Sequence, residues 1–240
     1  MYTVYELSIF LDDIAPLIWR RFLIPAHATL DDLHLVIQVV MGWDDVQGHR
    51  FMTGGMRFAL PRRSHGRFGQ VIGNEDACRI GDVLVKPKQR MIYVYDSAGV
   101  PRSWPDGRAD RASGAATALR DWRHTITLVA MQASLSAIPR CVDGGRACPP
   151  EAFGGPDGYS RFLSLPADPA TGRRLGVRSG HGIPADFDPD SFQSQAVNRR
   201  LVREWTPGQR RASEHDATPT AVAAASTATV TYLRHLIPGR

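Results

Sequence analysis

The chain has 240 residues and a mass of 26.4 kDa, which suits one elaborated domain or a domain with appendages. With 43% hydrophobic residues it can build a substantial core. The net charge is +5, but every cationic residue except Lys86 and Lys88 is an arginine, which indicates a compositional habit rather than a basic patch. We find neither a secretion signal nor about 18 consecutive apolar residues, so we expect a cytoplasmic protein without a membrane span.

Three cysteines, Cys78, Cys141 and Cys148, are too few and odd in number for a disulfide framework. This cysteine content favours a reducing compartment.

The first third of the chain has clear hydrophobic periodicity. Apolar and polar side chains alternate over residues 5–11, which predicts a strand, and residues 18–25 predict a second strand antiparallel to it. Thr29 and Asp32 then form a capping pair before an apolar stripe of helical spacing. This helix should stop at Gly42.

The middle of the chain predicts short strands around turns. Gly54-Gly55 should close a hairpin between residues 50–53 and 56–60. We also expect a helical turn from Ile80 and strands over residues 91–95 and 125–129. Residues 97–120 lack an apolar period and contain many glycines, prolines and arginines, so we interpret them as an inserted loop.

The last third contains fewer regular signals. Residues 139–159 predict an irregular loop, followed by a short helix near Tyr159. Asp188-Pro189 should open a final helix that runs to Trp205. Residues 206–240 are of low complexity and predict a disordered tail. We therefore expect one domain over residues 2–205 with an α+β fold, in which a mainly antiparallel sheet packs with a few helices.

Ordered motifs run along most of this domain. They are Tyr5-Glu6-Leu7, Pro16-Leu17-Ile18-Trp19-Arg20-Arg21, Thr29-Leu30 with Leu33-His34, Met41-Gly42-Trp43-Asp44-Asp45 with His49 and Phe51, Pro139-Arg140-Cys141, and residues 144–151, 154–159 and 187–198. In this order they resemble the plasmid pRiA4b ORF-3-like family. The resemblance implies an α+β fold and an accessory role on plasmids and mobile elements, where members are often labelled passenger or TnpR-type resolvase proteins.

Two departures from the family pattern affect a candidate site. The pattern resembles Tyr-Asp-Phe-Gly-Asp-x-Trp-x-His through one turn, whereas here Tyr95-Asp96 is separated from Asp121-Trp122-Arg123-His124 by the insertion. In the family that this chain resembles, many members also have a third cysteine at the position occupied here by Phe153. Both departures weaken the expectation that this chain has a metal site common to the family.

Carboxylates and imidazoles of the motifs form the candidate catalytic set, which suits acid–base or metal chemistry. The set consists of Asp44, Asp45, His49, Asp121 and His124. The structural alternative, which we favour, has Trp43 packed beneath the helix and Asp44 or Asp45 accepting backbone hydrogen bonds in the turn.

Other polar residues also have structural interpretations. Cys141 and Cys148 are weak metal-ligand candidates, because four ligands cannot be named nearby, and packed thiols are the favoured interpretation. His34 has no partner at metal-binding spacing and is expected to be a packed boundary residue. Arg20 and Arg21 should lie on opposite sheet faces and either grip an anion or pair with Glu6, which we favour.

No phosphate-binding loop, nucleophile elbow or resolvase-like serine and DNA-binding helix pair is recognisable. The leading hypothesis is therefore a non-enzymatic binding module without a cofactor, with nucleic acid as the candidate partner. Its candidate binding residues are Trp19, Arg20, Arg21, Trp43, Trp122 and Tyr159. The alternative is a metal-assisted hydrolase or nuclease that uses the catalytic set, and a third is a family member without activity.

Overall fold

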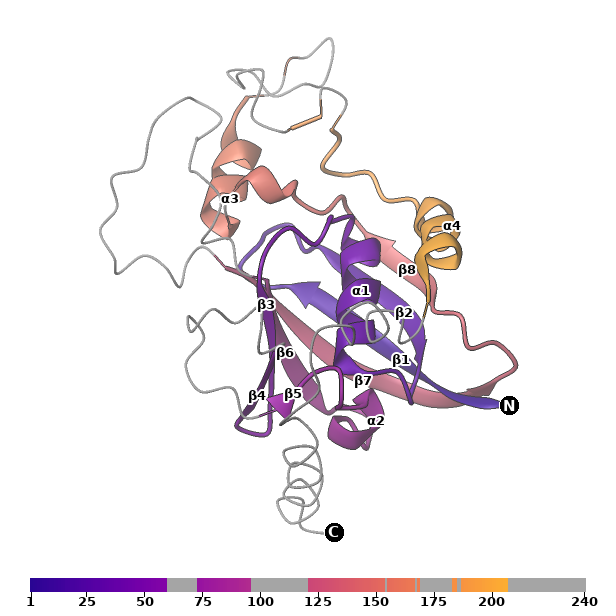
Figure 1. Ribbon diagram of the computed structural model, residues 1–240. Helices are drawn as coiled ribbons and strands as arrows, with labels where there is room; N and C mark the ends of the chain where they lie inside the picture. Colours follow the sequence, from indigo (N-terminus) through magenta and orange to yellow (C-terminus); the bar gives the residue numbers. More distant parts are fainter. Residues whose placement is uncertain are drawn as a thin grey trace, which may run out of the picture.

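A computed structural model describes residues 1–59, 73–95, 121–153, 155–166, 168, 183–184 and 187–206. Its centre is one eight-stranded sheet in the order β5-β4-β3-β6-β7-β1-β2-β8 (Figure 1). The strands are β1 (Tyr2–Leu11), β2 (Trp19–Pro25), β3 (His49–Thr53), β4 (Met56–Ala59), β5 (Gly73–Asn74), β6 (Arg90–Tyr95), β7 (Trp122–Ser134) and β8 (Arg140–Gly145). Only β4 and β5 pair in parallel, so the predicted α+β fold with a mainly antiparallel sheet is confirmed.

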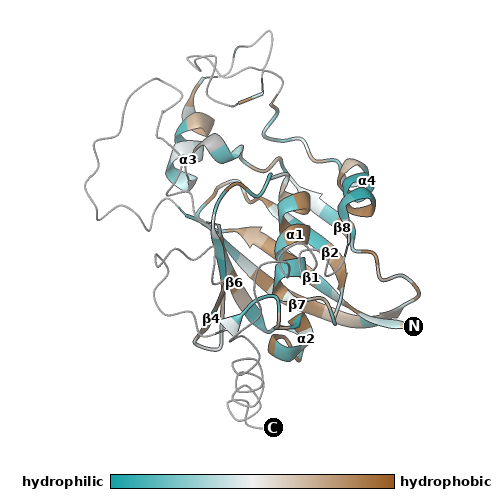
Figure 2. Cartoon of the chain, viewed as in Figure 1, coloured by the Kyte–Doolittle hydropathy of each residue, from teal (hydrophilic) through white to brown (hydrophobic). Residues whose placement is uncertain are grey.

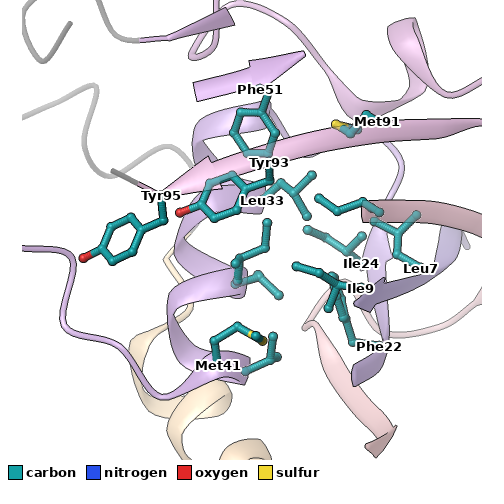
Figure 3. Close-up of a cluster of buried hydrophobic side chains, with 14 of the residues drawn as sticks. Leu7, Ile9, Phe22, Ile24, Leu33, Met41, Phe51, Met91, Tyr93 and Tyr95 are labelled. Carbon is teal, nitrogen blue, oxygen red and sulfur yellow. The ribbon is translucent and has the colours of Figure 1, made fainter. Parts of the chain in front are cut away.

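The helices pack against one face of this sheet. They are α1 (Leu30–Met41), α2 (Ile80–Val83), the 3-10 helix η2 (Glu151–Phe153), α3 (Pro156–Ser164) and α4 (Ser194–Glu204). Each contributes side chains to a single hydrophobic core together with inward-facing residues of the strands. In Figure 3, Leu33 and Met41 of α1 lie against side chains of β1, β2, β3 and β6. Brown and teal segments alternate along the elements in Figure 2, as this one-sided burial requires.

The predicted elements of the first third are confirmed. Strands β1 and β2 are antiparallel neighbours, with Leu7 opposite Phe22. Thr29 and Asp32 form a complete capping box at the start of α1. Gly42 ends the helix in the left-handed conformation, with φ 84° and ψ 28°, which glycine adopts without a steric penalty.

Two predictions for the last third are wrong. Residues 140–145 form strand β8 within the segment expected to be irregular, because β2 offers a backbone edge to which even a glycine-rich segment can pair. The last helix begins at Ser194 rather than at Asp188-Pro189. Instead, the Asp188 carboxylate accepts a hydrogen bond from the Asp190 backbone N–H, which closes a local turn.

Strand β8 is an edge of the sheet, and α4 covers part of it. The Asn198 side chain donates to the Cys141 carbonyl at 2.9 Å and accepts from the Cys141 N–H at 2.8 Å. The amide of Asn198 thereby occupies the position of a further strand at this residue.

The strands on either side of the expected insertion pair directly. Tyr95, at the end of β6, lies opposite Trp122, at the start of β7. The insertion over residues 97–120 and the tail over 206–240 fall almost wholly outside the described residues. In the part of the chain that is described, no helix has the length and hydropathy needed to cross a membrane.

Candidate metal centre

The loop after α1 brings Asp45 back over the helix. Gly42 turns the chain, and the Gly42 and Trp43 N–H groups both donate to the Gln38 carbonyl. Trp43 is buried and donates from Nε1 to the Pro149 carbonyl at 2.8 Å. Asp45 itself has a left-handed backbone with φ 56°, a conformation that aspartate tolerates better than most residues. The loop therefore fixes Asp45 at a defined position beside the helix.

A chain of hydrogen bonds begins and ends at Asp45. Its backbone N–H donates to Gln38 Oε1 at 2.9 Å, so Gln38 Nε2 is the donor to the Tyr93 hydroxyl, also at 2.9 Å. Tyr93 lies 2.9 Å from His34 Nδ1, and His34 Nε2 lies 2.8 Å from Asp45 Oδ1. With neutral His34, Tyr93 donates to Nδ1 and Nε2–H donates to the Asp45 carboxylate. The network thus fixes the orientation of the His34 ring.

A second imidazole lies against the first. The rings of His34 and His49 stack with centroids 3.5 Å apart and an angle of 5° between their planes. His49, on β3, places Nε2 2.8 Å from Glu75 Oε1, and both side chains are almost completely buried. Each histidine of the stack therefore has its own carboxylate.

These groups form the candidate metal centre, which we define as His34, Asp45 and His49. One ligand atom from each residue lies within 4.8 Å of the others. Two imidazoles and one carboxylate are a common ligand set for divalent transition metals. Within the described residues this is the one such group, and it includes neither Cys141 nor Cys148.

The partly buried carboxylate of Glu151 lies close to Asp44 and Asp45. Glu151 accepts hydrogen bonds from the Asp44 N–H at 2.9 Å and from the Tyr95 hydroxyl at 3.2 Å. Burial raises the pKa of Glu151, and the nearby negative charges of Asp44 and Asp45 raise this pKa further, against the two hydrogen bonds. Glu151 is therefore a better proton acceptor than an ordinary surface carboxylate.

A cavity of about 300 Å³ opens between α1 and α4 next to the candidate metal centre. Asp45 belongs to both. The cavity is lined by Leu35, Val36, Gln38, Val39, Trp43, Asp44, Asp45, Arg200, Leu201, Glu204 and Trp205. Arg200 links α4 to the loop after α1, because it donates to the Trp43 carbonyl at 3.1 Å. Within α4 it also donates to Glu204 at 3.0 Å.

The structure brings together only part of the expected catalytic set. Asp45 and His49 meet at the candidate metal centre. His124 is completely buried nearby, with its ring 5.4 Å from that of Tyr93, and burial lowers its pKa to about 3. Asp121 instead lies 3.1 Å from Arg50, and the Asp44 side chain is largely exposed.

The candidate binding residues divide between the two faces of the sheet. Arg21 pairs with Glu6 at 3.3 Å, as the structural interpretation predicted. Arg20 is buried on the helix side, where it donates to the carbonyls of Val40 and Gly145. Three aromatic candidates lie in the core and Trp19 is half-buried; the core residues are Trp43, Trp122 and Tyr159.

The two cysteines near Arg20 are unreactive thiols. Burial raises the pKa of Cys141 to about 11 and that of Cys148 to about 12, despite the opposing effect of the Arg20 guanidinium. Both cysteines are free. Their packing agrees with the structural interpretation of this segment.

Comparison with known proteins identifies the family. The sequence profile for plasmid pRiA4b ORF-3-like proteins matches residues 3–99 and 119–196. The chain belongs to this family. A curated relative, the uncharacterized protein y4hQ of Sinorhizobium fredii, is 27% identical and aligns over 87% of this chain and 97% of its own length.

A solved structure shares the fold of this pRiA4b ORF-3-like protein. It is the protein of unknown function MM3350 from Methanosarcina mazei Go1, which matches with a TM-score of 0.57 and 24% identity. The match covers 81% of this chain and 97% of the other. The family profile passes over residues 100–118, which lie within the stretch that we interpreted as an insertion.

Three residues at or beside the candidate metal centre were not predicted as functional from the sequence. His34 is not a boundary residue without partners, because it is completely buried between Asp45, Tyr93 and His49. Gln38 and Glu75 were likewise not singled out. A usable signal was present on α1: His34 and Gln38 are four residues apart, so two polar side chains share one face of a helix that is otherwise buried.

Proposed function

We propose that this pRiA4b ORF-3-like protein is a metal-assisted hydrolase whose ion is held by His34, Asp45 and His49. The observation that carries this proposal is the convergence of three ligand atoms within 4.8 Å in a largely buried position. Three protein ligands leave further coordination positions for water and substrate, as catalytic metal sites require. The mixed nitrogen and oxygen ligands favour zinc, iron(II), cobalt or manganese over calcium or magnesium.

The residues around Asp45 support hydrolysis. A metal ion lowers the pKa of a bound water molecule towards neutrality. Glu151, with its raised pKa, would be the group available to accept the proton of such a water and to return it to the leaving group. The neighbouring cavity of about 300 Å³ suits a small ester, amide or phosphoester substrate.

Metal content and stability provide the first test. Protein purified without chelator or affinity tag should contain one equivalent of a divalent transition metal, and a chelator should lower its melting temperature. The variants His34→Ala and His49→Ala should lose the metal, whereas His27→Ala, at an exposed histidine, should keep it. A metal-free protein whose melting temperature does not respond to added zinc would contradict the proposal.

Hydrolysis provides a separate test. With its metal bound, the protein should cleave p-nitrophenyl acetate or bis-p-nitrophenyl phosphate, the second of which tests for nuclease-like chemistry. Glu151→Gln should retain the metal and lose about 100-fold or more in rate, the usual contribution of a general base. A metal-loaded protein that cleaves neither compound would reject the hydrolase while leaving the metal site in place.

Nucleic-acid binding by a non-enzymatic accessory module stays a prediction, as do the cytoplasmic location and the association with mobile elements. Among the described residues, acidic side chains outnumber basic ones, so the positive net charge derives from the sequence outside them. Mobility shifts with single- and double-stranded DNA at low salt test the prediction, because phosphate contacts are strongest there. A complete lack of binding at low salt would exclude it.

A further inference from the structure

Beside the candidate metal centre, His49 and Glu75 bring together a group of buried polar atoms. The side chains of His49 and Glu75 are 1% and 0% exposed. Their closest atoms are 2.8 Å apart, yet none of the four polar atoms makes a hydrogen bond of regular geometry within the described part of the chain. In native proteins almost every buried polar atom has a partner, and an ion is one explanation for such an exception.

The Glu75 carboxylate determines which His49 nitrogen carries a proton. A buried carboxylate at 2.8 Å from Nε2 favours the tautomer with Nε2–H and leaves the lone pair on Nδ1. Metal-binding histidines commonly have this arrangement, in which one ring nitrogen binds the ion and the other donates to a carboxylate. His34 also directs Nε2 at a carboxylate, but this carboxylate, Asp45, is itself a member of the candidate metal centre. An ion held between the two would replace the Nε2 proton, and the His34 ring would then carry its proton on Nδ1, which donates to the Tyr93 hydroxyl.

We infer that His49 binds the ion through Nδ1, that His34 binds it through Nε2, and that Glu75 is a positioning residue that accepts the Nε2–H hydrogen bond of His49 and so leaves Nδ1 for the ion. The inference rests on the proposed function and specifies how the metal centre is built. It gives Glu75 a role that depends on the ion: the carboxylate accepts the Nε2–H hydrogen bond and makes Nδ1 a stronger ligand.

The stacked rings indicate which side chain moves when the ion binds. An imidazole directs its lone pair within the ring plane, and metal–nitrogen bonds are about 2.0–2.1 Å long. Two parallel rings 3.5 Å apart therefore cannot both point at one ion. His34 has hydrogen bonds at both nitrogens, whereas His49 has one close polar partner among the described residues, so His49 is the ring that turns out of the stack.

Nitrogen NMR of the full chain tests the ligating atoms directly. Long-range ¹H–¹⁵N spectra of the histidine side chains, recorded before and after one equivalent of zinc, distinguish the two nitrogens of each ring. We expect zinc to shift Nδ1 of His49 and Nε2 of His34, while His49 Nε2 keeps its proton. Ligation through His49 Nε2, or no change at His49, would overturn the inference although the protein binds zinc. If no zinc binds, the proposed function fails, and the inference fails with it.

The role of Glu75 has its own variant. Glu75→Gln keeps the shape of the side chain and removes its charge, so zinc affinity, measured by competition with a chromogenic chelator, should fall 10-fold or more. Asp12→Asn makes the same chemical change beside Arg123, away from the metal centre, and should leave the affinity unchanged. An unchanged zinc affinity in Glu75→Gln would overturn the positioning role. If this variant does not fold, the wild-type spectra still decide between the two nitrogens.

Discussion

Tyr93 connects α1 to the sheet through a single hydroxyl. It accepts a hydrogen bond from Gln38 Nε2 and lies 2.9 Å from His34 Nδ1, and burial raises the pKa of the phenol well above its usual range. The hydroxyl therefore stays protonated at neutral pH. The loss of this one oxygen would remove a hydrogen bond from two buried polar groups, Gln38 Nε2 and His34 Nδ1.

Tyr93→Phe should for this reason lower the free energy of unfolding by about 1–3 kcal/mol, the cost of leaving buried hydrogen-bonding groups unsatisfied. Urea denaturation at pH 7 measures the effect. Tyr2→Phe, at an exposed tyrosine, makes the same chemical change and should have no effect. Equal unfolding midpoints for Tyr93→Phe and the wild type would contradict the importance of the network.

His124 predicts how stability depends on pH. Burial lowers its pKa in the folded protein to about 3, below the ordinary value of 6.5, although nearby backbone carbonyls oppose the shift. Between these two pH values the unfolded chain binds a proton that the folded chain does not, so stability falls as the pH decreases from 6.5 towards 3. The contribution of neutral His124 to the free energy of unfolding is fully present above pH 6.5.

Urea midpoints of the wild type and of His124→Phe, measured between pH 7 and 4, test this expectation. The variant should lose less stability on acidification, whatever its stability at pH 7. His27→Gln changes an exposed histidine and should retain the slope of the wild type. A variant slope as steep as that of the wild type would assign the acid sensitivity to other groups.

The sequence predicted two of the three residues of the candidate metal centre. Asp45 and His49 stood out because they follow a well-defined helix in a family motif. His34 was misjudged because its partners Asp45, His49 and Tyr93 are distant along the chain, and local spacing does not reveal contacts made by packing a helix on a sheet. Glu75 was missed for the same reason, since it lies on a turn between β5 and α2.

At the scale of elements, the end of α1 determines where the candidate metal centre lies. Gly42 adopts φ 84°, and the chain then turns so that Asp45 reaches His34. The helix was predictable because its capping box, apolar stripe and final glycine are all local signals. Strand β8 was not predictable, because its sequence becomes a strand only beside β2.

Gly42→Ala tests this helix end. A residue with a Cβ pays about 1–2 kcal/mol in the left-handed region, so the free energy of unfolding should fall by that amount. No atom lies within 4 Å of the added Cβ, which isolates the backbone effect. Gly42→Asn should cost less, because asparagine tolerates this conformation. Urea unfolding that finds alanine as stable as glycine would refute the argument.

At the scale of the whole molecule, one continuous sheet carries all the described helices on one face. The pairing of β6 with β7 places Tyr93 and His124 side by side across two neighbouring strands. The family profile bridges these two strands without residues 100–118. The hairpin, rather than the inserted sequence, should therefore determine the fold.

Replacement of residues 100–118 by a four-residue turn should preserve cooperative unfolding and change the melting temperature by only a few degrees, because shortening a loop alters its closure entropy little. Differential scanning calorimetry and circular dichroism measure both quantities. A matched replacement with 19 Gly and Ser residues separates sequence from length. Loss of the cooperative transition in both variants would show that the native segment contributes to the core.

The contact between Asn198 and strand β8 affects how the protein behaves at high concentration. An open strand edge is a template on which a second molecule can add its own strand, and repeated addition leads to fibrils. Because one side-chain amide satisfies both backbone groups of Cys141, the edge offers a newcomer no hydrogen bonds at this residue. At this residue Asn198 therefore opposes the addition of a second strand, an effect that stability measurements on dilute protein would not detect.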